Sequence, residues 1–120
     1  MKIMKTLVAG VVAGAMMLSS PLALAHAKLT HSKPPAGASI GEVPSQLTLT
    51  FSAPLHLTYV ALAPTSGEVI KLEIPSKRAN AVHALPLPVL LPAVYTVEWR
   101  ALSSDGHIMN GSWQFTMAGN

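Results

Sequence analysis

The chain contains no cysteine, and this absence removes several classes of protein at once. Without cysteine there is no disulfide framework, no lipid-modified cysteine and no thiolate that could act as a nucleophile or a metal ligand. Charged residues make up only 11% of the sequence, so a broad surface of one charge is not expected either. No glycine-rich phosphate loop is present. Histidine remains as the main carrier of chemistry.

Long hydrophobic runs are also absent. The apolar stretch Leu7–Leu18 has 12 residues, whereas a membrane-spanning helix needs roughly 20. Two lysines precede this stretch and the small-residue triplet Ala23–Ala25 follows it, which is the layout of a secretory signal peptide. We therefore expect a signal peptide over residues 1–25, and an exported protein without a membrane anchor, formed by a single domain over residues 26–120.

The basic character of the chain is concentrated in its first residues. The formal net charge is +3, but two of the eight basic side chains precede the apolar stretch, so that six basic and five acidic side chains remain in residues 26–120. They are scattered and do not form the stripe with interleaved aromatics that follows a phosphate backbone. We expect no nucleic-acid partner. The dispersed acidic residues and the missing nucleophile-elbow pattern also argue against a hydrolase.

The most regular pattern beyond the leader is the alternation of apolar and polar residues with period two. In Gln46–Ser52 the apolar side chains fall on one face, and the ranges 57–63, 68–74, 93–102 and 111–117 alternate in a similar way. Pro and Gly separate these ranges, and prolines between 75 and 92 indicate an edge strand or a long connection there. Helical spacing is hard to find. The sequence predicts an all-β antiparallel sandwich or small barrel with Greek-key links.

Aromatic residues on the apolar faces of these strands predict the core. We expect the core to include the following side chains: Phe51, Tyr95, Trp99, Trp113 and Phe115.

Five histidines follow the leader, and the first of them has a special position. Cleavage after Ala25 would make His26 the amino-terminal residue. Its free α-amine, with a pKa of roughly 8, would then lie beside its own imidazole, and both nitrogens could chelate one metal ion. For His31 we expect a structural role, and for His56 and His83 a solvated surface position without a ligand role.

Asp105 and His107 are the second candidate pair. They are two residues apart, so that in an extended segment both side chains would point to the same face. Asp105-Gly106 is also a strong hairpin-turn signal, which leaves open a purely structural role for this segment. An amine, two imidazoles and a carboxylate form an N3O donor set. Cu(II) favours tetragonal N,O coordination, and zinc accepts the same ligands with tetrahedral geometry.

These residues resemble the CopC-like periplasmic copper-binding proteins. The likeness covers essentially the whole chain after the leader. It rests on a leader ending directly before His26-Ala-Lys-Leu, on the four segments given next, and on Gly111. The segments are Pro34-Pro35-Ala36-Gly37, Leu49-Thr50-Phe51-Ser52, Tyr95-Thr96-Val97-Glu98-Trp99-Arg100 and Ser103-Ser104-Asp105-Gly106-His107. The combination of a terminal histidine with Ser-x-Asp-x-His is its most specific element.

The resemblance implies a seven-stranded Greek-key β-barrel or sandwich (Ig-like) that binds one Cu(II) per chain and has no catalysis of its own. The implied metal ligands are His26, Asp105 and His107. It further implies a role in copper homeostasis or copper resistance in the periplasm, a monomer, and a membrane copper transporter of the envelope as a candidate partner. Some members carry a glutamate where this chain has Ala53, and others carry a methionine-rich loop that is missing here.

Two other functions remain open from the sequence alone. A copper-dependent oxidase or monooxygenase could use the same terminal-histidine site. A metal-free β-sandwich could serve only to bind another envelope protein. Copper-dependent turnover of a polysaccharide would favour the first, and absence of bound copper with an amino terminus other than His26 would favour the second.

Overall fold

The computed structural model describes residues 27–119, and in this range the chain forms seven strands and no helix. The predicted signal peptide and His26 lie outside the described residues. The strands are β1 (Leu29–Lys33), β2 (Ser39–Ile40), β3 (Gln46–Pro64), β4 (Ile70–Lys71), β5 (Asn80–Pro86), β6 (Ala93–Ser103) and β7 (Ile108–Met117). No helix within residues 27–119 is long and apolar enough to cross a membrane.

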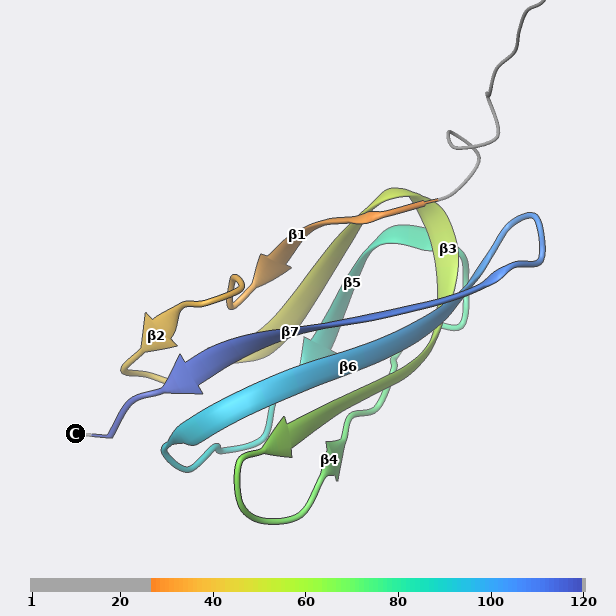
Figure 1. Cartoon of the computed structure of the whole chain (residues 1–120). Helices are drawn as coiled ribbons and strands as arrows, with labels where there is room; N and C mark the ends of the chain where they lie inside the picture. Colours follow the sequence, from red (N-terminus) through yellow and green to blue (C-terminus); the bar gives the residue numbers. More distant parts are fainter. Residues whose placement is uncertain (1–26, 120) are drawn as a thin grey trace, which may run out of the picture.

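The long strand β3 organises the molecule because it takes part in both layers of the sandwich. Its first part pairs with β1 and β5, and its second part pairs with β4 and β6. Figure 1 shows β3 arching over from one layer to the other. β7 pairs with β6, and all these pairings are antiparallel. The predicted all-β class is confirmed, with the short parallel pairing of β2 with β7 as the one departure from a purely antiparallel sheet among residues 27–119.

The pairing of β3 is interrupted around Ala53-Pro54, between the ranges 46–52 and 57–63 that the sequence predicted as two strands. Phe51 still pairs with β1, and Leu55 already pairs with β5 and β6, but the two residues at the bend have no partner in either ladder. Proline lacks the backbone N–H that a ladder requires, so a position without a ladder partner tolerates it. The chain therefore bends without ending the strand.

The core fills the space between the two layers, and its residues follow the predicted alternation. Phe51, Trp99, Trp113 and Phe115 are all buried, as predicted. The Phe51 and Trp99 rings meet edge to face with centroids 5.0 Å apart, a favourable arrangement for aromatic pairs. Tyr95 is buried too, and its hydroxyl donates a hydrogen bond to the carbonyl oxygen of Leu91.

The described amino end and the β6–β7 turn are joined to the same stretch of β3. The amide of Lys28 donates to the Ser52 hydroxyl, and the amide of Ser52 donates to the Lys28 carbonyl. Three residues further along β3, Leu55 pairs with Ser103, the last residue of β6. In Figure 1 the start of β1 and the turn between β6 and β7 lie at the same end of the sandwich. The fold thus brings the described amino end and the turn that carries Asp105 and His107 to one end of the molecule.

Candidate metal centre

The predicted ligands Asp105 and His107 lie in the tight turn between β6 and β7. The turn is closed by two backbone hydrogen bonds: Ser103 N–H donates to the His107 carbonyl at 2.9 Å, and Gly106 N–H donates to the Ser103 carbonyl at 3.0 Å. Gly106 has a φ of 90°, in the left-handed region that favours glycine. The sequence signal for a hairpin turn is therefore correct, and the three residues between Ser103 and His107 form it.

Inside this turn the carboxylate and the imidazole meet. His107 Nδ1 lies 2.9 Å from Asp105 Oδ2, and the two side chains are 62% and 39% exposed, respectively. The structure brings the two residues together as predicted, although it does so through a turn and not through an extended segment. Their exposure means that an ion from solution can reach both donor groups.

The environment of Asp105 favours its charged form. The Ser103 hydroxyl donates to Asp105 Oδ1, and the His107 amide lies 3.4 Å from the same oxygen. The hydrogen bond from Ser103, followed by the contacts with His107, lowers the pKa of Asp105 from 3.8 to about 2. Asp105 is therefore an ionised ligand candidate at neutral pH.

Two donors do not complete a metal site. Among residues 27–119 no three His, Asp or Glu side chains converge on one point. The third predicted ligand, His26, lies outside the described residues, directly before the buried Ala27. Lys28, two residues further along the chain, is hydrogen-bonded to Ser52 of β3, three residues from the point where Leu55 pairs with the end of β6.

The other histidines have contacts that agree with structural roles. His83 is buried, and its Nε2 lies 3.1 Å and 2.9 Å from the carbonyl oxygens of Leu55 and Asn80. The predicted solvated position is therefore wrong for His83, because its side chain lies with that of Leu85 on the buried face of β5. His56 Nδ1–H donates to the carbonyl of Lys77 at 2.9 Å, and the exposed His31 lies beside Thr30.

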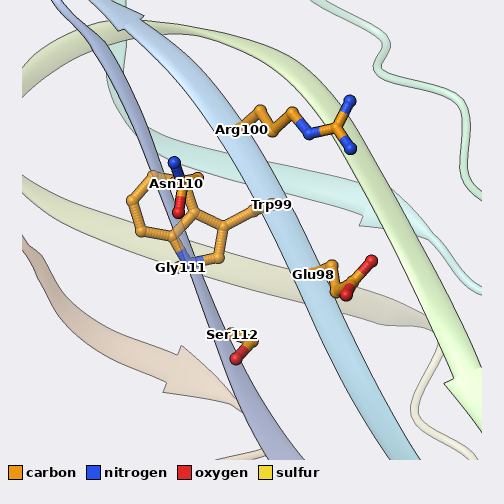
Figure 2. A pocket seen from close by; sticks show the side chains of 6 residues that line it. All are labelled: Glu98, Trp99, Arg100, Asn110, Gly111 and Ser112. Carbon is orange, nitrogen blue, oxygen red and sulfur yellow. The ribbon is translucent and has the colours of Figure 1, made fainter.

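A polar hollow of about 390 Å³ over β6 and β7 was not predicted from the sequence. Figure 2 shows its lining side chains: Glu98, Trp99, Arg100, Asn110, Gly111 and Ser112. It contains a single carboxylate and no imidazole, so it does not offer the donors of a copper or zinc site. The Arg100 guanidinium lies over the Tyr59 ring instead, 4.4 Å from its centroid.

The fold and the turn together define a small all-β domain that presents a carboxylate and an imidazole at one end. Comparison with known proteins gives the family. The model of the CopC domain matches residues 29–118, and the chain belongs to this family.

Two relatives and one solved structure illustrate the likeness. The chain is 35% identical over 106 residues to protein YobA of Escherichia coli strain K12, covering 83% of this chain and 85% of that protein. It is 34% identical over 109 residues to copper resistance protein C of Pseudomonas syringae pv. tomato, covering 82% of this chain and 86% of that protein. The crystal structure of CopC from Methylosinus trichosporium OB3b has the same fold, with a TM-score of 0.68 at 24% identity over 79% of this chain and 96% of that one.

Proposed function

We propose that this protein is an exported Cu(II) carrier or buffer of the periplasm, active in copper homeostasis or resistance and without catalysis of its own. The observation that carries the proposal is the ionised Asp105 held against His107 at the end of the sandwich where the described chain begins. The family, with relatives such as copper resistance protein C, supports copper as the ion.

The donor set fits Cu(II) better than softer ions. Asp105 and His107 supply a carboxylate and an imidazole, and His26, as the first residue after cleavage behind Ala25, would supply an amine and a second imidazole. Tetragonal N,O coordination suits Cu(II), while thioether and thiolate donors suit Cu(I). The chain has no cysteine, and only Met109 and Met117 lie beyond the proposed leader. Both are at least partly buried, in or against the core.

The amino terminus is the sharpest test of this proposal. As long as a residue precedes His26, its nitrogen is an amide, which is a much poorer donor than an amine. A protein that begins with one additional residue before His26 should keep its fold but lose several factors of ten in Cu(II) affinity, each worth about 1.4 kcal/mol. Acetylation of His26 should have the same effect.

The measurement is competition with a Cu(II) chelator on proteins whose termini have been verified by mass spectrometry. Electron paramagnetic resonance at one equivalent of Cu(II) should show three nitrogen donors in the protein that begins at His26 and fewer in the extended one. Circular dichroism provides the control that both proteins fold. Equal Cu(II) affinity of the native and extended proteins would rule out the α-amine of His26 as a ligand and with it the terminal chelate.

A further inference from the structure

Ser103 is the one buried residue of the turn that carries the candidate ligands. It is 5% exposed and ends β6, where it pairs with Leu55 of β3. The four residues that follow it, Ser104 to His107, are all exposed. The ligand-bearing turn is therefore anchored to the rigid sheet at Ser103, and the residues that would bind the ion extend from this anchor into solvent.

The hydroxyl of Ser103 contacts both candidate ligands. Its oxygen lies in hydrogen-bond contact with Asp105 Oδ1, 3.2 Å from the His107 amide nitrogen and 3.2 Å from the His107 carbonyl oxygen. A hydroxyl has one proton to donate and lone pairs to accept with. A bond to a carboxylate is the stronger choice for that proton because it is charge-assisted. Ser103 thus donates to Asp105 and accepts from the His107 N–H.

We infer that Ser103 is a positioning residue of the proposed Cu(II) site, which holds the Asp105 carboxylate and the His107 backbone in the arrangement that binds the ion. This inference rests on the proposed function. An exposed aspartate on a turn otherwise samples several rotamers, and fixing one of them before binding reduces the entropy lost on binding. Contacts of this kind behind a metal ligand typically change metal affinity by about 10- to 100-fold.

The first test compares three single variants of the protein that begins at His26. Ser103→Ala removes the hydroxyl and should weaken Cu(II) binding by about tenfold or more. Ser103→Thr keeps the hydroxyl and should restore most of the affinity. Ser104→Ala, at the exposed neighbouring serine, is the matched control and should leave the affinity unchanged. Chelator competition gives the three dissociation constants.

A double-mutant cycle separates positioning from a general effect on the fold. If Ser103 acts through Asp105, the double variant Ser103→Ala/Asp105→Ala should bind Cu(II) about as weakly as Asp105→Ala alone, because the hydroxyl has lost the group that it positions. In the metal-free protein, Ser103→Ala should also accelerate hydrogen exchange of the His107 amide, which loses the nearer of its two acceptors, while the amides of the β6–β7 ladder keep their protection.

Three outcomes would overturn the inference. In the first, Ser103→Ala binds Cu(II) as tightly as the unchanged protein while that protein behaves as proposed, so that only the role of Ser103 fails. In the second, the losses from the two substitutions add, which assigns Ser103 a general role in stability. In the third, the unchanged protein itself has no tight Cu(II) site, and the proposed function fails together with the inference.

Discussion

Asp105 is an exposed residue whose ionisation is controlled by its own turn. The hydrogen bond from Ser103 and the contacts with His107 lower its pKa from 3.8 to about 2. A group whose pKa is lower in the folded state stabilises the fold above its unfolded pKa, and this contribution is lost as the pH falls through its folded pKa. The stabilising contribution of the Asp105 carboxylate should therefore be complete above about pH 4 and be lost between about pH 4 and pH 2.

This pH dependence can be measured directly on the carboxyl group. In the metal-free protein, the carboxyl carbon shift of Asp105 should titrate with a midpoint near 2. Ser103→Ala removes the hydrogen bond that contributes most to the lowered pKa, so the midpoint should move up toward the ordinary value of about 3.9 for an aspartate. Ser104→Ala should leave it in place. A midpoint of Asp105 that is unaffected by Ser103→Ala would contradict the assigned hydrogen bond.

At this scale the sequence predicted the metal-site candidates but not the residue behind them. The spacing of Asp105 and His107 predicted that the two side chains meet, although a turn and not the assumed extended segment brings them together. Ser103 belongs to the same motif, but its role depends on its burial at the end of β6, and burial depends on pairing with the distant Leu55. The position of His83 was predicted wrongly for a similar reason. Prolines surround β5 in the sequence and obscure the alternation by which every second residue of this strand faces the core.

Among the elements, the strands with clean alternation were predicted and the others were not. The predicted ranges 93–102 and 111–117 correspond closely to β6 and β7. The predicted strand over 68–74 shortens to the two residues of β4, and the strand β1 was not predicted. For the proline-rich range 75–92 the sequence left open an edge strand or a long connection. Within the described residues β5 lies in this range and pairs only with β3, so it is an edge strand. Short edge strands show little alternation in their own sequence, because their position is set by the strands with which they pair.

Gly111 in β7 gives a prediction about the packing of these elements. It pairs with Trp99, and a Cβ at Gly111 would lie 2.7 Å from Cζ2 of the Trp99 ring. This ring is buried and packs edge to face on Phe51, so moving it aside would disturb that contact. Gly111→Ala should therefore destabilise the fold by about 1–3 kcal/mol, the usual cost of overpacking a core.

Gly41 offers the matched control. A Cβ there would have no neighbour within 4 Å, and its backbone is not in the left-handed region. Gly41→Ala should therefore change the unfolding free energy by no more than about 0.5 kcal/mol, as is usual for surface substitutions. Urea unfolding followed by tryptophan fluorescence compares the two variants. Equal stability of both would mean that the ring of Trp99 does not lie over Gly111 in solution.

At the scale of the whole molecule, composition and alternation were sufficient for the fold class and insufficient for the strand order. The alternation indicates strands with one buried and one exposed face, and therefore a sandwich or a small barrel. The order β1-β3-β6-β7-β2, with β4 and β5 also on β3, depends on pairings between residues far apart in the chain. No local pattern specifies these pairings, and the continuous β3 across Ala53-Pro54 was hidden by a proline, which argues against the interior of a strand.

The arching β3 has a thermodynamic consequence for a chain without cysteine. Because β3 brings the amino end and the β6–β7 turn to one end of the molecule, an ion held by His26, Asp105 and His107 would cross-link the beginning of the folded domain to its last hairpin. Binding to the folded state alone stabilises it by about 2.7 kcal/mol when free Cu(II) is at 100 times its dissociation constant. For a domain of this size, each kcal/mol raises the melting temperature by roughly 4–8 °C.

We therefore expect calorimetry to show a melting temperature higher by roughly 10–20 °C under these conditions. The protein with one residue added before His26 should show a much smaller rise at the same Cu(II) concentration, because its amino end no longer holds the ion. An equal rise in both proteins would mean that copper does not join the two ends of the domain. If the rise is specific to the native terminus, the ion supplies the closure that a disulfide provides in many small secreted domains.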